Sequence, residues 1–232
     1  MPLDAQAIAT LKTVSTATIT TVLLKKGLRN VWIRGAKPIR QGQPRLVGPA
    51  FTLRFVPARE DLATPESWGN PISTRSAIEA MPEGVITVID AMGVTDAGVF
   101  GDILCARMAK RNVAAMVTDG VVRDLAGVLS TKLPIWCAGV AAPSSVTGLT
   151  FVNWAEPIGC GGVAVFPDDV IVADDDGCVL IPQAMLDHVL ATAPEQERME
   201  GWIMEEVGRG EVLPGLYPMN EATKARYEAW KK

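Results

Sequence analysis

Two short polar segments contain the glycine, acidic and arginine residues that could bind a small anionic ligand and act on it. The first is Gly101-Asp-Ile-Leu-Cys105, which is predicted to open a helix, and the second is Asp119-Gly-Val-Val-Arg-Asp124. Each segment follows a predicted buried strand. Because ligands of open α/β sheets bind beyond the carboxyl ends of parallel strands, these segments form the candidate site.

The start of that helix and one arginine could together bind a carboxylate. A helix N-terminus leaves several backbone N–H groups without intrahelical partners, and its dipole favours an anion. A guanidinium offers a planar fork that suits carboxylate or enolate oxygens. The predicted substrate-binding residues are Gly101, Asp102, Ile103, Leu104 and Arg123.

Two acids complete the candidate site. Asp124 offers a hard oxygen ligand for Mg²⁺ or Mn²⁺, and a metal held by one carboxylate and several waters leaves positions open for a substrate. Asp102 could position or deprotonate a water. We therefore predict Arg123 and Asp102 as catalytic residues and Asp124 as the metal ligand.

The same residues also have a purely structural interpretation. Asp102 and Asp124 could each cap a helix, and Arg123 could form an ordinary ion pair with Asp119. The pattern D-G-x-x-R-D is short and weakly specific. From spacing alone, both interpretations stay open.

The middle of the chain predicts the elements that would position this site. Apolar runs of strand length cover 85–90, 113–118 and 133–138, and helices are predicted from Asp102 through Arg111 and over 123–130. This β-α-β-α-β order predicts parallel strands with right-handed crossovers. Adjacent strands would place the two polar segments side by side.

The N-terminal part predicts helix, loop and one strand. Residues 3–13 are predicted to be helical, and a second helix begins near Ser15 or Thr16 and ends at Gly27. A strand is predicted over 49–57. Residues 58–72 are polar and rich in turn formers, which favours a surface loop and leaves a mobile lid as the alternative.

The later part of the chain predicts short strands and then helices. The strands cover 162–166, 170–173 and 178–181, and the acidic run 174–176 is interpreted as a turn, since it lacks the spacing of a calcium loop. Pro194 is predicted to separate two C-terminal helices. Apolar residues share one face of the second helix, namely Met199, Trp202, Ile203 and Val207. The tail, residues 213–230, is expected to pack on a neighbouring subunit.

Composition argues against several classes of protein. The net charge is −4 and the sequence pI about 5.1, and the short basic pairs are interpreted as helix ends, so we expect no nucleic-acid partner. The N-terminus lacks the pattern of a signal peptide, and no run of about 18 apolar residues occurs. We therefore expect a cytoplasmic protein without membrane contact.

Cysteine and histidine usage narrows the chemistry further. The four cysteines, at positions 105, 137, 160 and 178, form no C-x-x-C pair, which argues against a zinc ribbon. The single histidine, His188, lies in a predicted helix far in sequence from any candidate nucleophile. A histidine-rich zinc site or a Ser-His-Asp triad is therefore not expected.

The combination of motifs resembles the RraA-like family. The stretch from Gly101-Asp102 to Arg123-Asp124 carries the resemblance together with Ser15-Thr-Ala-Thr18 and Met81-Pro-Glu-Gly-Val85. Three later motifs add to it, namely Gly161-Gly-Val163, Pro167-Asp-Asp-Val170 and Ala173-Asp-Asp-Asp-Gly177. The resemblance covers roughly residues 10–185, with a helical extension over 186–232, so we expect a single RraA-like domain over 1–232.

The resemblance implies a fold, an assembly and a site. The fold is a swivelling β/β/α domain of the α/β class, with a parallel βαβ core and a helical N-terminal segment. The assembly is a homotrimer or homohexamer with active sites between subunits. The implied roles match those argued above, and the implied cofactor is a divalent metal, Mg²⁺ first, with Mn²⁺ and Co²⁺ as alternatives.

The family includes 4-hydroxy-4-methyl-2-oxoglutarate / 4-carboxy-4-hydroxy-2-oxoadipate aldolases, which implies a class II pyruvate aldolase. A 4-hydroxy-2-oxo acid would be cleaved to pyruvate and a second carbonyl compound without a Schiff base. Oxaloacetate decarboxylation is expected as a side activity. A sugar-acid dehydratase-type lyase on the same site is the first alternative. A non-catalytic regulator that binds a ribonuclease is the second, and a structural trimer is the third.

The chain also departs from the aldolases. Thr21 stands where many members carry an acid, and residues 58–75, hereafter the 58–75 insert, together with the tail after residue 195 indicate a distinct subgroup. The regulator branch departs from the Gly-Asp and Arg-Asp pairs, which this chain keeps. A second acid could come from a neighbour's C-terminal helix, where the candidates are Glu197, Glu200, Glu205 and Glu206.

Overall fold

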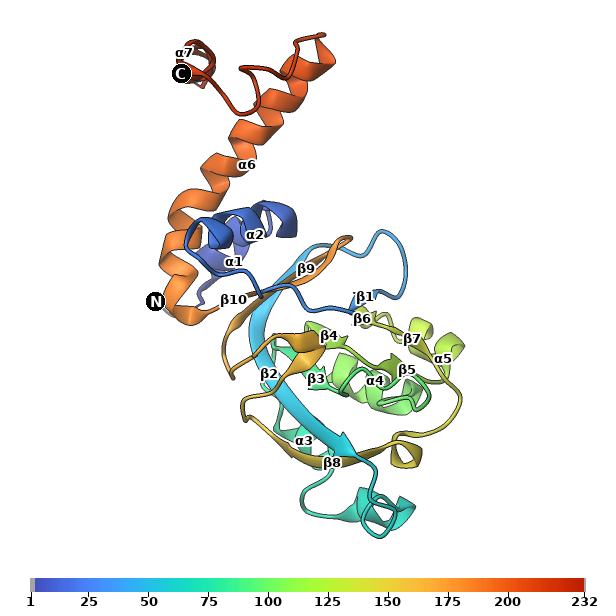
Figure 1. Cartoon of the computed structure of the whole chain (residues 1–232). Helices are drawn as coiled ribbons and strands as arrows, with labels where there is room; N and C mark the ends of the chain where they lie inside the picture. Colours follow the sequence, from blue (N-terminus) through green and yellow to red (C-terminus); the bar gives the residue numbers. More distant parts are fainter. Residues whose placement is uncertain (1–2, 232) are drawn as a thin grey trace.

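The computed structural model describes residues 3–231, and its longest strand, β2 (Leu46–Pro57), runs through the middle of the main sheet (Figure 1). β2 pairs in parallel with β3 (Ile86–Asp90) and antiparallel with β8 (Leu149–Trp154) and β9 (Val170–Asp174). The sheet order is β1-β6-β4-β3-β2-β9-β10, with β8 added beside β2. The other strands of this sheet are β1 (Lys37–Pro38), β4 (Ala115–Thr118), β6 (Ile135–Cys137) and β10 (Gly177–Ile181).

The parallel core confirms the α/β prediction. β3, β4 and β6 are parallel neighbours, with α4 (Asp102–Lys110) after β3 and α5 (Leu125–Ser130) after β4. These strands are almost entirely buried, which explains why their sequences are continuous apolar runs rather than alternating ones. A small second sheet, β5 (Val121–Val122) with β7 (Gly139–Val140), lies beyond their carboxyl ends.

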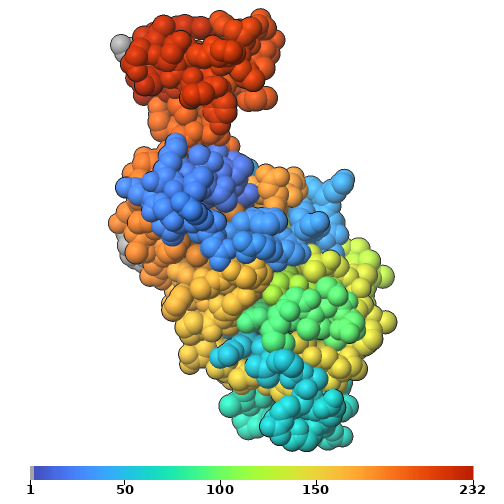
Figure 2. Space-filling view, in the orientation of Figure 1, coloured from blue at the N-terminus to red at the C-terminus, as the bar shows by residue number. Residues whose placement is uncertain are grey.

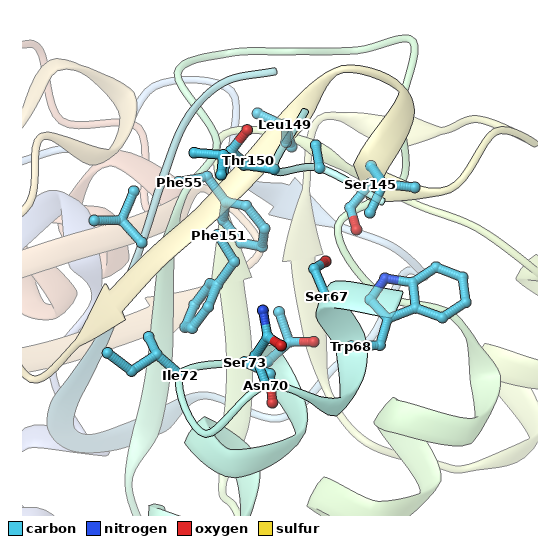
Figure 3. A pocket seen from close by; sticks show the side chains of 15 residues that line it. Phe55, Ser67, Trp68, Asn70, Ile72, Ser73, Ser145, Leu149, Thr150 and Phe151 are labelled. Atoms are coloured by element: carbon cyan, nitrogen blue, oxygen red, sulfur yellow. The ribbon is translucent and has the colours of Figure 1, made fainter. Parts of the chain in front are cut away.

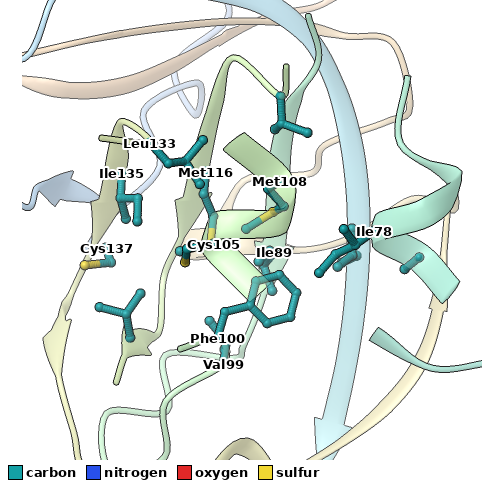
Figure 4. Close-up of a cluster of buried hydrophobic side chains, with 14 of the residues drawn as sticks. Ile78, Ile89, Val99, Phe100, Cys105, Met108, Met116, Leu133, Ile135 and Cys137 are labelled. Atoms are coloured by element: carbon teal, nitrogen blue, oxygen red, sulfur yellow. The ribbon is translucent and has the colours of Figure 1, made fainter. Parts of the chain in front are cut away.

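A buried apolar layer fixes α4 against this sheet. Cys105 and Met108 of α4 share one core cluster with Ile89, Met116 and Ile135 of the three parallel strands (Figure 4). All five side chains are fully buried. Burying one large apolar side chain contributes about 1.5–3 kcal/mol, so this layer determines where the first turn of α4 lies.

The N-terminal helices form as predicted and pack beside β9 and β10. They are α1 (Ala5–Leu11) and α2 (Thr16–Lys25), and the Ser15 hydroxyl caps α2 by accepting the Thr18 N–H at 3.1 Å. Asp174, at the end of β9, accepts both the N–H and the hydroxyl of Thr16. The Ser15–Thr18 motif therefore ties α2 to the sheet.

Across residues 3–231, no individual helix has the length and apolarity needed to cross a membrane. The adjoining pair α1 and α2 meets that criterion jointly by length and composition, with a bend of 100° between the two helices.

The C-terminal helix α6 (Leu186–Gly208) continues through Pro194, so the predicted break there is wrong. Its first half packs against α1 and α2, and its second half contributes Trp202 and Ile203 to another apolar cluster. Packing on both sides of the proline outweighs the single backbone hydrogen bond that a proline removes. Val207, predicted on the buried face, is 37% exposed.

The end of the chain folds back onto α6 of the same chain. The helix α7 (Glu221–Trp230) places Tyr227 in the cluster with Trp202, Ile203 and Leu216. The end of α6 and residues 209–231 form the C-terminal lobe. Figure 2 shows this lobe standing apart from the rest of the protein, at one end of the molecule. The partner of α7 within this chain is α6, while packing on a neighbouring subunit stays a prediction.

One predicted strand is absent and one predicted loop is partly helical. Residues 162–166 contain no strand, because the turn Cys160–Gly162 places Gly161 and Gly162 at positive φ and leaves only a bridge between Ile158 and Val165. The 58–75 insert contains a 3₁₀ turn (Pro65–Gly69) and leads into α3 (Thr74–Ala80). Two further 3₁₀ turns cover Ser145–Thr147 and Gln183–Met185.

Candidate active site

The two polar segments lie side by side, as predicted. The loop after β3 meets the segment after β4 through two backbone hydrogen bonds. Val99 N–H donates to the Val121 carbonyl at 2.8 Å, and Arg123 N–H donates to the Phe100 carbonyl at 3.0 Å. The order of the parallel strands thus brings the Gly101-Asp102 and Arg123-Asp124 pairs together.

Two glycines make this approach possible. A Cβ added at Gly101 would lie 2.5 Å from Asp124 Oδ2, and one added at Gly98 would lie 2.9 Å from the Cβ and backbone N of Arg123. Any other residue at these positions would push the Arg-Asp pair away. Gly101 also occupies the N-cap position of α4, with extended backbone angles.

Arg123 and Asp124 form an ion pair with each other, since Arg123 Nε donates to Asp124 Oδ2 at 3.0 Å. Asp124 has a left-handed backbone, with φ 56° and ψ 47°, and its side chain makes no capping hydrogen bond to α5. The structural interpretation of these residues is therefore wrong in two respects. Asp124 is not a side-chain cap, and Arg123 does not pair with Asp119.

Asp119 instead forms hydrogen bonds with backbone N–H groups of three separate residues around the site. Its carboxylate accepts N–H groups from Ala91 at 2.8 Å, Gly93 at 3.1 Å and Gly161 at 3.0 Å. Burial raises the pKa of Asp119, while the three N–H donors oppose that shift. Asp119 links the loops after β3 and β4 to the Gly161 turn.

Asp102 is the first residue of α4, and its Oδ1 accepts the Ile103 N–H at 2.7 Å. The first N–H to bond back to the carbonyl four residues earlier is that of Cys105, which donates to Gly101 at 3.1 Å. The N–H groups of Asp102 and Leu104 precede that bond and stay available to a ligand. The Asp102 carboxylate can thus support the helix start and also face a substrate.

All the predicted site residues line one pocket of about 340 Å³. Sequence reasoning missed eight further lining residues. Three of them, 98–100, directly precede the predicted segment, and the other five are Trp68, Thr74, Arg75, Ser144 and Ser145. The first three of these five lie in the 58–75 insert, where polar composition indicated only a loop. The sequence feature that could have indicated them was a tryptophan within a polar segment, with an arginine close to it.

Comparison with known proteins identifies the family. A model of the RraA-like family, Aldolase/RraA, matches residues 13–180.

The chain belongs to the RraA-like family.

A Halalkalibacterium halodurans protein provisionally named 4-hydroxy-4-methyl-2-oxoglutarate aldolase is 34% identical to this RraA-like chain over 162 residues, which cover 69% of this chain and 70% of that protein. Protein DlpA of Legionella pneumophila is 33% identical over 154 residues. That match covers 66% of this chain but only 24% of DlpA, so the chain spans about a quarter of that relative.

The RraA-like fold is also found in a solved structure. The crystal structure of Streptomyces coelicolor RraAS2, described as an unusual member of the RNase ES inhibitor RraA protein family, has a TM-score of 0.77 and 31% sequence identity. The match covers 87% of this chain and 97% of that one. The relatives of this RraA-like chain thus carry both enzyme and regulator names.

The pocket's oxygen donors fit a hard divalent cation. Within residues 3–231 no group of three or more His, Cys, Asp or Glu side chains could hold a metal ion. Asp124 and Asp102 are the acids of the pocket. A Mg²⁺-type ion commonly takes one or two carboxylates and completes its shell with water and substrate oxygens, so this donor set is compatible with it.

A second pocket of about 270 Å³ adjoins the first and shares Trp68, Thr74 and Ser145 with it. Figure 3 shows Phe55, Phe151 and Ile72 on one side of this pocket and Ser67, Trp68 and Ser145 on the other. The 58–75 insert therefore forms a wall of both pockets rather than a peripheral loop. Its suggested role as a mobile lid stays a prediction.

The four C-terminal glutamates all have partners within this chain. Glu197 accepts the N–H and hydroxyl of Ser15, and Glu200 accepts the Thr18 hydroxyl. Glu205 and Glu206 pair with Arg209, and Glu206 also pairs with Arg226. These contacts position α6 and α7, and a role in a neighbour's active site stays a prediction.

Proposed function

We propose that this chain is a divalent-metal-dependent lyase that cleaves a 4-hydroxy-2-oxo acid to pyruvate and a second carbonyl compound. One observation supports this above all: the start of α4, Asp102, Arg123 and Asp124 line a single pocket. An anion site, a guanidinium and two carboxylates can together bind an oxo acid and stabilise the enolate that forms from it. The provisional aldolase name of the Halalkalibacterium relative agrees with this proposal.

Each part of the pocket has its own role in the proposed reaction. The free N–H groups at the start of α4 bind the substrate carboxylate. Arg123 gives only Nε to Asp124, so its two Nη groups can face the oxygen on C2, where negative charge develops. Asp124 would hold a divalent ion, which when bound would supply Lewis-acid polarisation of the C2 carbonyl.

The bond cleavage is a retro-aldol step. Asp102, through a water that it holds, takes the proton of the C4 hydroxyl. The C3–C4 bond breaks, its electron pair forms the enolate of pyruvate, and C4 becomes the carbonyl carbon of the second product. Protonation of C3 then yields pyruvate. Oxaloacetate gives the same enolate by losing CO₂, so its decarboxylation is part of the proposal.

The test is pyruvate formation by the purified protein. Oxaloacetate and 4-hydroxy-4-methyl-2-oxoglutarate are supplied separately with Mg²⁺ or with EDTA, and a coupled dehydrogenase reports pyruvate. We expect metal-dependent pyruvate that falls about 10²–10³-fold in Arg123→Lys and Asp124→Asn. The exposed pair Arg59–Asp61 lines neither pocket, so Arg59→Lys and Asp61→Asn are matched controls.

A regulator that binds a ribonuclease is the second candidate, favoured by the similarity to Streptomyces coelicolor RraAS2. A folded, metal-loaded protein that forms no pyruvate from either compound would contradict the lyase proposal. Capture of purified RNase ES by the immobilised chain, together with that inertness, would support the regulator instead.

A further inference from the structure

Arg75 is a second arginine in the pocket, and the 58–75 insert supplies it. It lines the same pocket as Arg123, Asp124 and the start of α4. The Arg75 guanidinium carbon lies 4.6 Å from the centroid of the Trp68 ring, and its Nη1 donates to the Thr74 hydroxyl at 3.3 Å. A cation–π contact and a hydrogen bond thus hold the guanidinium at the pocket wall.

In the described part of the chain, no ion pair accounts for this charge. Among residues 3–231, no carboxylate lies within ion-pair distance of Arg75, and burial alone lowers its pKa. Arg75 is also in the first turn of α3, where a cation is disfavoured by the helix dipole. A partly buried arginine that lacks an ion-pair partner, at an unfavourable helix position, is a group that can bind an anion.

The charges of the pocket indicate which kind of anion would suit Arg75. Asp124 already pairs with Arg123, and the substrate's oxo-acid carboxylate is assigned to the start of α4 in the proposed function. Arg75 is then the remaining cation of the lining, accompanied by the hydroxyls of Ser144 and Ser145. These groups suit a second carboxylate on the same ligand.

We propose that Arg75, held by Trp68 and Thr74, is a specificity residue that binds a second carboxylate at the end of the substrate remote from the oxo acid. The pocket then prefers dianionic oxo acids over oxo acids with an apolar end. This inference rests on the proposed function for the assignment of the first carboxylate. The competing occupant is an apolar substrate end, which would enter the adjoining pocket beside Phe55 and Phe151.

The test is equilibrium binding, so that it does not depend on turnover. 2-Oxoglutarate carries two carboxylates and lacks the 4-hydroxyl, so the retro-aldol step cannot cleave it. 5-Methyl-2-oxohexanoate replaces its remote carboxylate with an isopropyl group of similar shape. Calorimetry in Mg²⁺ buffer should show 2-oxoglutarate binding about 10–100-fold more tightly to the native protein, which is the range for a charge-assisted hydrogen bond.

The variants assign that preference to Arg75. Arg75→Met should remove this preference by weakening the binding of 2-oxoglutarate. Arg75→Lys should keep part of it, because the charge stays but the fork is lost. Trp68→Phe should lower the preference for 2-oxoglutarate only slightly, and Trp68→Ala should lower that preference further. Arg59→Met, in the same insert but outside both pockets, should leave both affinities unchanged.

The outcomes separate this inference from the proposed function. Equal binding of the two compounds by the native protein would overturn the inference, as would tighter binding of the apolar compound, which would assign the substrate end to the adjoining pocket. An Arg75-dependent preference without any pyruvate formation would uphold the second-carboxylate site and reject the lyase. If neither compound binds, the carboxylate site at α4 and the inference both fail.

Discussion

The carboxylate of Asp102 lies directly against Gly127, where an added Cβ would come within 2.5 Å of Asp102 Oδ2 and 2.6 Å of its Cβ. The two residues belong to α4 and α5, whose contact therefore depends on the absence of a side chain at Gly127. The position of the proposed water-holding acid is set by a glycine that does not line the pocket.

Gly127→Ala should damage activity more than stability. Alanine is favoured over glycine in a helix by about 1 kcal/mol, which offsets part of the clash with Asp102. The displaced carboxylate should lower kcat about 10²-fold, the cost of a misplacement of about 1 Å. Pyruvate formation and thermal unfolding of the same samples give the two readouts.

Gly201→Ala is the matched control, because Gly201 lies inside α6 and an added Cβ meets nothing within 4 Å. It should raise stability slightly and leave kcat unchanged. Full activity in Gly127→Ala would show that Asp102 has no positional role in the reaction.

The sequence predicts the parallel core well and the pocket only in part. The strand–helix order, the cap at Ser15 and the joining of the Gly101 and Arg123 segments follow from local patterns and from the geometry of parallel sheets. The partners of Asp119 and Arg123 could not be predicted, because spacing does not tell which of two nearby acids an arginine meets.

The errors have a common cause in contacts between distant segments. Pro194 stays helical because α6 packs on α1 and α2, and the 162–166 strand is lost to the turn at Gly161. Arg75 and Trp68 enter the pocket because the 58–75 insert folds over it. Each outcome depends on partners far away in the sequence, which local propensity does not contain.

Asp119→Asn should lower the free energy of unfolding by about 1–3 kcal/mol at pH 7. The asparagine Nδ2 cannot accept a hydrogen bond, so at least one of the N–H groups of Ala91, Gly93 and Gly161 would lose its partner. Urea unfolding followed by fluorescence measures the loss. An unchanged midpoint would mean that Asp119 does not link these loops.

The same substitution should also change the pH dependence of stability. Burial raises the pKa of Asp119 above its usual value of 3.8, so the folded state binds the proton more tightly than the unfolded chain does. The native protein should therefore gain stability relative to Asp119→Asn as the pH falls towards 4. A difference between the two proteins that is constant with pH would contradict this assignment.

All four cysteines should be unreactive in the native state. Burial raises the pKa of Cys105 to about 12, raises that of Cys137, and raises those of Cys160 and Cys178 well above 9. Thiolate is the reactive form, so an aromatic disulfide reagent at pH 8 should label no thiol before denaturation and four afterwards. Rapid labelling of native protein would indicate local opening around α4 or β6.

Glu206→Gln should loosen the C-terminal lobe while leaving the body folded. The Glu206 side chain is 8% exposed and pairs with both Arg209 and Arg226, which are far more exposed. Losing these pairs should cost about 1–3 kcal/mol locally, because the Trp202–Tyr227 cluster is separate from the other cores. Faster hydrogen exchange and tryptic cleavage over residues 209–231 would report it.

Glu205→Gln is the control for that experiment, since the Glu205 carboxylate is 54% exposed and its pair with Arg209 is a surface one. It should leave exchange rates nearly unchanged. If both variants increase hydrogen exchange in the C-terminal lobe equally, the net charge of α6, and not the buried Glu206 pairs, stabilises the lobe.

Gly98, Gly101 and Gly127 leave the space in which the side chains of Arg123, Asp124 and Asp102 lie. Every single-base change that alters a glycine codon without creating a stop introduces at least a Cβ, so random mutation at these positions displaces those side chains. Trp68 and Arg75 of the 58–75 insert line the pocket with side chains, which a single substitution can exchange for others. New substrate ranges should therefore arise, in laboratory selection as in natural divergence, by exchange of residues in that wall.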